Sequence, residues 1–346
     1  MTSILCSIPN PNDTTSLYRS IGPLQTLARK HGGINLGVNP DISWSMLKAC
    51  DLVFFQRPFL DVHLRGMKIS KVNNKPVWID YDDYLHAIPI CNKRFPMYGD
   101  PQVQNLIAQM IAMADVVTVS TDHLKESLLK ILGYFPAENP NYILQSEKIM
   151  TIPNAYDPEL HGPIERTERA KKIIWRGSDS HSKDLLLHTK QICNIVRDFP
   201  DWEIEFIGEP FWLTMEEVKR VAKPGKFSIT ASLDPIDFFR YLKKQRPTVV
   251  IVPLEDIAFN RSKSNIAWIE ATMAGAVTLA PAWPEWQKPG AINYEGVEDF
   301  EAQLRSILNG EYPEQVLWEE SRDYIASDLT LDQVNELRYK LLRGAS

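Results

Sequence analysis

The sequence has few cysteines, and none of them stands at a spacing that suits a metal site or a redox pair. Cys6, Cys50, Cys91 and Cys193 are far apart in a chain of 346 residues, and no two of them form a CxxC pair. Isolated cysteines of this kind are typical of reduced thiols. The pattern therefore predicts free cysteines in a cytosolic protein.

Long apolar runs and a strong excess of positive charge are also absent. Apolar runs such as Thr248–Leu254 are far shorter than the about 20 residues of a membrane span. Met1–Pro9 lacks the basic start of a signal peptide and reaches a proline early, so we expect a cytoplasmic protein without a membrane span. A net charge of −6 argues against non-specific coating of nucleic acid, although it does not exclude a local basic face.

What the chain does have is length and a regular alternation of patterns. Its 346 residues exceed one ordinary core, so two domains of about 150 residues each are expected. Short apolar runs alternate with longer helical patterns, which is typical of βαβ units and parallel sheets. The expected strands are Ser3–Ile8, Gly33–Gly37, Asp51–Phe55, Pro76–Asp80, Val116–Ser120, Lys148–Ile152, Lys172–Trp175, Glu203–Ile207, Phe227–Ile229, Thr248–Pro253 and Ala276–Leu279.

The polar stretch Asn154–Ala170 separates these strands into two sets. We therefore predict an α/β protein with two Rossmann-like domains, residues 1–160 and 166–316, followed by a helical tail, 317–346. Expected helices include Ser182–Asp198, Pro235–Lys244 and Asn265–Ala274. Ligands of such folds bind at the carboxyl ends of the strands, so two domains facing each other would enclose a cleft.

A polar loop before the helix expected at Asn265 gives the strongest local signal. Free N–H groups at a helix start, with Arg261 and Lys263 beside them, form an anion site. Glu270 follows about a turn and a half later on an otherwise apolar stretch, where a carboxylate could accept from two ribose hydroxyls. A capped helix whose glutamate pairs with a lysine is the competing interpretation. The predicted nucleotide-binding residues of this segment are Arg261, Ser262, Lys263, Ser264, Asn265 and Glu270.

A second cluster follows the first strand of the second set. Gly177 allows a sharp turn, and Arg176 and Lys183 could hold a diphosphate whose charge grows as it leaves. A solvated loop with a helix cap is the alternative, and for His181 a surface or capping role competes with sugar contact. The spacing does not match a Walker A loop.

A third cluster, Asp80–His86, lies at the end of the expected strand Pro76–Asp80. Neighbouring carboxylates are costly to place together unless they bind or position something. One interpretation makes Asp80 and Asp82 a metal-binding DxD of single-domain transferases. Another places Asp82, Asp83 and His86 at the acceptor side of a cleft, and a third is helix capping with solvated charge. Lys263 would stabilise the leaving diphosphate. The loop Asn12–Ser16, with Arg19 and Gly22, would face the same cleft.

Several of these segments, in this order, resemble motifs of the family 4 retaining glycosyltransferases. Residues 114–120 look like the family's "ADxVxxxS" strand, 148–157 like its "KIxVIPNGVD", and 270–277 like its "EAMAxGxPV". Lys183 matches the family's diphosphate-binding lysine, and Glu270 its ribose-binding glutamate. Three positions depart from the pattern: Ser178 stands in place of the arginine, Asp184 in place of a glycine, and Ser262 in place of the first glutamate. The Asn-Arg-Ser-Lys-Ser and Asp-Tyr-Asp-Asp segments are similar to a compact bacterial and phage-encoded branch.

The resemblance implies a GT-B fold whose last helix, within Leu317–Leu342, crosses back to the first domain. It implies transfer of a sugar with retention from a nucleotide diphosphate, UDP being expected, to an acceptor hydroxyl, with no metal and no cofactor beyond the donor. Phage members of this branch include enzymes that glycosylate hydroxymethylcytosine in their own DNA, which makes DNA a candidate partner. The basic residues that could track its phosphates are Arg65, Lys68, Lys71, Lys75, Lys93 and Arg94. A cell-envelope saccharide or lipid acceptor and a non-catalytic sugar-nucleotide-binding module are the alternatives.

Overall fold

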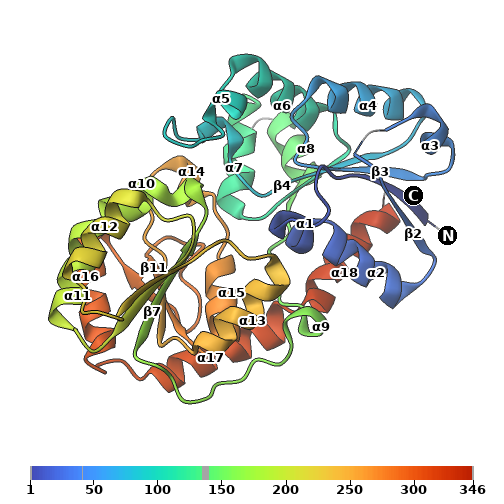
Figure 1. The fold of residues 1–346 in the computed structure, drawn as a ribbon. Helices are drawn as coiled ribbons and strands as arrows, with labels where there is room; N and C mark the ends of the chain where they lie inside the picture. The colour runs from blue at the N-terminus through green and yellow to red at the C-terminus, as the bar shows by residue number, and fades with distance from the viewer. Residues whose placement is uncertain (1, 41, 135–139, 345–346) are drawn as a thin grey trace.

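The computed structural model describes residues 2–40, 42–134 and 140–344 and places them in two α/β halves, each built on a six-stranded sheet (Figure 1). Every strand pair is parallel. The first sheet has the order β2-β1-β3-β4-β5-β6 and contains β1 Thr2–Ser7, β2 Ile34–Val38, β3 Leu52–Gln56, β4 Val77–Tyr81, β5 Val116–Val119 and β6 Ile149–Thr151. The second has the order β12-β11-β10-β7-β8-β9 and contains β7 Lys172–Gly177, β8 Glu203–Gly208, β9 Phe227–Thr230, β10 Val249–Ile251, β11 Val277–Pro281 and β12 Ile292–Tyr294.

Helices follow most of these strands. The helices of the first half are α1 Thr14–Arg19, α2 Ile21–His31, α3 Trp44–Lys48, α4 Asp61–Val72, η1 Leu85–Ala87, α5 Phe95–Tyr98, α6 Pro101–Met113, α7 Asp122–Ile131 and α8 Pro140–Lys148, with α9 Pro158–His161 in the connection. The later helices are η2 Asp179–His181, α10 Ser182–Leu187, α11 Thr189–Asp198, α12 Trp212–Val221, α13 Pro235–Gln245, α14 Ala258–Arg261, α15 Ile266–Met273, α16 Gly296–Leu308, α17 Glu314–Asp328 and α18 Leu331–Gly344.

The predicted strands all occur, with ends that shift by two residues or fewer, but β12 was not predicted. The helix predicted over Ser182–Asp198 is two helices, α10 and α11. The backbone N–H of His188 bonds to the Leu185 carbonyl three residues back, which ends α10 with a tighter turn before α11 begins.

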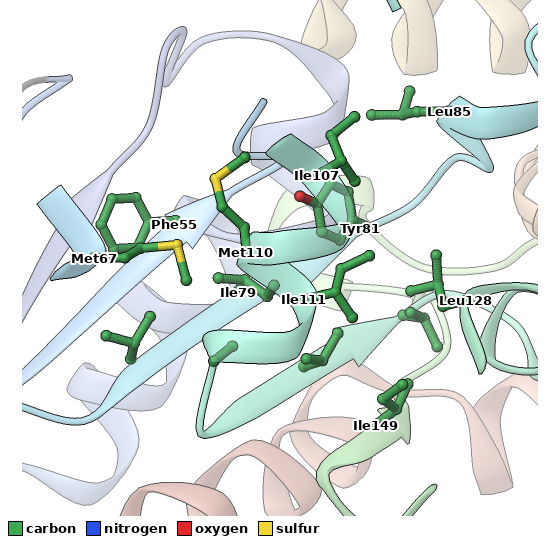
Figure 2. Close-up of a cluster of buried hydrophobic side chains, with 14 of the residues drawn as sticks. Phe55, Met67, Ile79, Tyr81, Leu85, Ile107, Met110, Ile111, Leu128 and Ile149 are labelled. Carbon is green, nitrogen blue, oxygen red and sulfur yellow. The ribbon is translucent and has the colours of Figure 1, made fainter. Parts of the chain in front are cut away.

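Both faces of the first sheet are covered, which explains why its strands are almost continuously apolar. Phe55, Ile79 and Tyr81 point to one face and pack against α4, α6 and α7, as Figure 2 shows for this cluster. Phe54 and Trp78 point to the other face and pack with residues of α2 and α18. The alternation of side chains along each strand therefore builds two cores, one on either side of the sheet.

The predicted tail, 317–346, contains two helices with different partners. Helix α17 stays on the second half, where the Trp268 indole N–H donates to Ser321 Oγ at 3.1 Å. Helix α18 alone crosses back and lies along α2, where Asn335 Nδ2 donates to the Pro23 carbonyl at 2.9 Å (Figure 1). The expected crossing is confirmed, but the segment that makes it begins at Leu331 rather than at residue 317.

The returning chain meets the outgoing connection between the halves. Leu331 N–H donates to the Tyr156 carbonyl at 2.7 Å, and Tyr156 N–H donates to the Leu329 carbonyl at 2.9 Å. The two crossings therefore run side by side. Among the helices that the structure describes, none is both long and apolar enough to cross a lipid bilayer.

Candidate functional site

A cavity of about 410 Å³ lies between the two halves. In each sheet the strand order reverses next to the first strand, between β1 and β3 in one half and between β7 and β10 in the other. Loops that follow these strands supply the walls, among them Asp13 and Arg57 from the first half and His181 and Lys263 from the second. Such reversal points are where open α/β sheets bind ligands, and the volume lies within the roughly 300–1,000 Å³ of small-molecule sites.

The wall from the first half contains carboxylates that are held by arginines. Arg57 Nε donates to Asp82 Oδ1 at 2.9 Å, and its Nη2 lies 3.3 Å from Asp83 Oδ2. Deeper in the sheet, Arg19 makes two hydrogen bonds to Asp80, at 3.1 and 2.7 Å. Asp80 and Asp82, the pair in the metal-binding interpretation, are thus engaged by different arginines. No three His, Cys, Asp or Glu side chains of the described residues are grouped so that they could hold a metal ion.

An ion pair joins the two walls. Lys263 Nζ lies 3.2 Å from Asp83 Oδ1 and 4.5 Å from the centre of the Phe259 ring. Phe259 belongs to the second half but is buried in the core cluster of the first, so this loop is fixed to both halves. Burial raises the pKa of Asp83, but Lys263 and Arg57 outweigh this effect and hold that pKa at about 2.

The wall from the second half contains a close pair of Arg176 and Glu270. Arg176 Nη2 lies 2.6 Å from Glu270 Oε2, and the Tyr18 hydroxyl donates to Glu270 Oε1 at 3.5 Å. Neither atom of the ion pair makes a well-aligned hydrogen bond, and Arg176 Nε has no hydrogen-bond partner among the described residues. Burial raises the pKa of Glu270, and Arg176 offsets part of this. Buried polar atoms without a protein partner are expected to meet a ligand or water.

The loop after β7 brings one more side chain to this wall. His181 Nδ1 lies 2.9 Å from Asp184 Oδ2. Asp184 is itself buried and accepts from Asn260 Nδ2 at 2.6 Å and from the Glu255 backbone N–H at 2.9 Å. Gly177 does not line the cavity. A Cβ there would lie 2.6 Å from the buried Trp175 ring, so glycine lets the strand end pass over that ring.

Lys183, Arg261 and His86 do not line the cavity. Lys183 is half-exposed and pairs with Glu255 at 2.7 Å. Arg261 makes two hydrogen bonds to Asp256, at 2.5 and 2.8 Å. His86 Nε2 lies 2.9 Å from the Gln104 carbonyl oxygen, on the side of α6. The predicted site residues that line the cavity are Asp82, Asp83, Arg176, Lys263, Ser264 and Glu270.

The start of α15 differs from the anion site expected there. The Asn265 backbone N–H donates to Glu285 Oε1 at 3.2 Å, so a carboxylate of the protein already occupies this position. Burial raises the pKa of Glu285 to about 7. Ser262 is fully buried and its carbonyl accepts from Thr121 Oγ1 at 3.0 Å, which makes it a contact between the halves. Ser264 does line the cavity and its Oγ accepts from Asn154.

Arg57 and Glu285 are the charged residues of this region that the sequence analysis missed. Arg57 is a non-glycine residue with a φ of +47°, a rare conformation that directs its side chain toward Asp82. Its one available signal is its place directly after a strand, which has meaning only once the strand order is known. Glu285 lies 20 residues after Asn265 in sequence, and no motif connects them.

The basic residues proposed for DNA do not form one face. Lys71 pairs with Asp115, whose carboxylate also accepts from the backbone N–H of Val77 at the amino end of β4. That edge of the sheet is opposite the carboxyl ends that line the cavity. Arg94 lines the cavity, and Lys93 pairs with Asp179 beside it at 3.2 Å. Lys71 therefore lies away from Lys93 and Arg94.

Comparison with known proteins shows similarity in fold. No protein-family model matches the chain, and no curated protein matches it in sequence. A glycosyltransferase from Rickettsia africae superimposes with a TM-score of 0.67 at 11% identity, over 99% of this chain and 98% of that one. HepE of Anabaena, solved with UDP and glucose, gives 0.66 at 10% identity over 99% of both chains. A putative UDP-N-acetylglucosamine 2-epimerase from Listeria monocytogenes gives 0.57 at 14% identity, over 99% and 96%.

These whole-chain similarities and the two facing parallel sheets show that the protein has the GT-B fold. The fold alone does not select a reaction, because its members carry out more than one chemistry.

Proposed function

We propose that the protein is a glycosyltransferase that moves a sugar from a UDP-sugar to an acceptor hydroxyl. The observation that carries the proposal is the set of Arg176, Glu270 and Lys263 around the cavity between the halves. The two cations would meet the negative diphosphate, and the Glu270 carboxylate would accept from ribose hydroxyls. HepE, which has a similar fold, was solved with UDP and glucose.

The donor contacts differ in part from those that the family motifs imply. Lys183 and Arg261 pair with acids outside the cavity, so we assign the diphosphate to Arg176 and Lys263 instead. Asp82 and Asp83 would position the acceptor from the opposite wall. In the proposed mechanism the configuration of the sugar is retained and the departing phosphate takes the acceptor proton. The cationic side chains stabilise the charge on that phosphate as the bond to the sugar breaks.

For the acceptor, hydroxymethylcytosine in DNA and a cell-envelope saccharide or lipid remain the two candidates. Lys71 lies away from the cavity, which weakens the argument for a basic face that follows the phosphates of a DNA duplex. Arg94, in contrast, places a cation at the cavity itself. Transfer assays on hydroxymethylcytosine DNA and on saccharide acceptors, each read by the mass of the product, distinguish the two.

Calorimetry with UDP tests the donor site. Lys263→Ala and Glu270→Ala should each weaken binding by about 1–3 kcal/mol, because each removes a group that bonds the ligand. Lys183→Ala is the matched control and should bind UDP like the wild type, since Lys183 pairs with Glu255 outside the cavity. Unchanged affinity in both cavity variants would overturn the assignment. Binding without turnover of any UDP-sugar in a panel would favour the non-catalytic module.

A further inference from the structure

His181 is the one histidine among the described residues that line the cavity. Its Nδ1 is fixed by Asp184, a buried carboxylate that two further hydrogen bonds hold in place. With Nδ1 as the donor to Asp184, Nε2 is the ring atom left to face a ligand, and no described residue bonds it. The side chain is 17% exposed, so a bound molecule can reach it.

The groups around this ring include the proposed donor cations. Lys263 and Arg176 disfavour the protonated ring, Asp184 favours it, and Asp83 on the opposite wall interacts with it through charge. Burial is the largest influence and lowers the pKa of His181 below its usual value, so the ring is neutral near pH 7 in the free protein. An unprotonated Nε2 cannot donate a hydrogen bond to a phosphate oxygen.

A diphosphate that binds Lys263 and Arg176 changes this balance. Its negative charge offsets the two cations that oppose protonation, and its oxygens offer acceptors for an Nε2–H. We propose that His181 takes up a proton as the donor binds and becomes a third contact to the diphosphate, with Asp184 as its positioning residue. The proton comes from the buffer, and no covalent bond other than N–H forms. This inference rests on the proposed donor site.

Calorimetry with UDP-glucose, repeated in buffers of different ionisation enthalpy, measures this proton directly. Each phosphate of UDP-glucose has one ester and one anhydride bond and keeps a single, strongly acidic oxygen, so the ligand itself has no phosphate that titrates near neutral pH. At about pH 7.5 the wild type should take up protons on binding, and its affinity should rise by up to about tenfold for each pH unit of acidification. His181→Gln should bind more weakly, with proton uptake near zero and a flat pH dependence.

His86→Gln is the matched control, because it makes the same chemical change at a histidine that bonds Gln104 outside the cavity. It should keep the proton uptake of the wild type. The ring signal of His181 in NMR, titrated with and without UDP-glucose, gives a second reading that needs no variant, and its pKa should rise on binding. UDP-glucose binding without proton uptake, or with uptake that survives in His181→Gln, overturns this inference alone. No binding of UDP-glucose or UDP by the wild type overturns the proposed function as well.

Discussion

The two walls of the cavity both carry charged side chains but satisfy them differently. In the first half, Asp80 and Asp82 are each held by an arginine of the same half. In the second half, Glu270 and Arg176 approach each other closely, yet Arg176 Nε has no hydrogen-bond partner among the residues that the structure describes. The Asp80 and Asp82 carboxylates are therefore paired without a ligand, whereas the Arg176–Glu270 pair has unused hydrogen-bonding capacity.

This difference suggests separate tasks for the two walls. A wall whose charges are already paired is rigid and suits the positioning of a neutral hydroxyl group. A wall with unpaired polar atoms gains most from a ligand that supplies the missing partners, as a nucleotide diphosphate would. Variants of the first wall, a variant of the pair that joins the walls and removal of metal test this division.

Breaking the deepest pair of the first wall should have the largest effect. The side chains of Arg19 and Asp80 are 1% and 3% exposed, with Nη2 and Oδ2 2.7 Å apart. Arg19→Met leaves a buried carboxylate without its partner, so the free energy of unfolding should fall by about 3–5 kcal/mol in urea denaturation. Arg29→Met, which breaks an exposed pair with Glu159, should cost about 1 kcal/mol or less. Equal small losses would show that the first wall does not depend on its internal pairing.

Asp82→Asn should separate acceptor positioning from donor binding. The variant keeps the shape of the side chain but removes the charge that faces Arg57 and accepts from Thr15 Oγ1. We expect sugar transfer to fall roughly 10²-fold, a size typical of lost positioning, while UDP affinity stays at the wild-type value. Transfer rates and calorimetry on the same preparation measure both. A loss of UDP affinity would mean that this wall binds the donor, and full transfer activity would mean that Asp82 serves the fold alone.

The pair between the walls should make stability depend on pH in the acid range. The pKa of Asp83 is about 2 in the folded protein, below the about 3.9 of an unfolded aspartate. Asp83 therefore contributes stability above about pH 4, and this contribution is lost as the pH falls toward 2. We expect an effect on the order of 1–2 kcal/mol, seen as the difference between wild type and Asp83→Asn in denaturation at several acid pH values. Identical pH profiles would show that the pair with Lys263 does not form in solution.

Chelation should have the smallest effect. Because Asp80 and Asp82 are engaged by different arginines, we expect sugar transfer in EDTA to equal that in its absence. Measured rates before and after dialysis against EDTA check this. If activity were lost and manganese restored it, the cationic side chains would not be sufficient to stabilise the charge on the leaving diphosphate. The assignment of donor and acceptor to the two walls would then be wrong.

Much of the fold could be predicted because the strands are buried on both faces and so form distinct apolar runs. Strand β12 has three residues, as β6 and β10 do, but it escaped prediction because Asn293 at its centre interrupts the apolar run. The partners of the charged side chains were harder to predict from the sequence. Lys183 matches a family motif, but Asp184, in place of the usual glycine, is buried against His181 and Asn260, and Lys183 next to it pairs with Glu255.

Other parts of the site depend on contacts between distant segments. Arg57 reaches Asp82 because its backbone is in a left-handed conformation, and no neighbouring residue type predicts that conformation. Glu285 occupies the start of α15 from another loop. The sequence identified Arg176 because it follows an expected strand, Lys263 because it lies in the polar loop before an expected helix, and Glu270 because it lies within that helix. It could not show that Arg176 and Glu270 would form a pair.

The double crossing between the halves has a mechanical consequence. A single connection would let the halves rotate relative to each other about any axis. Two connections that hydrogen-bond to each other through Tyr156 and Leu331 restrict this rotation more than a single connection would. This joint therefore resists a twist that would move the wall of Asp82 away from the wall of Arg176.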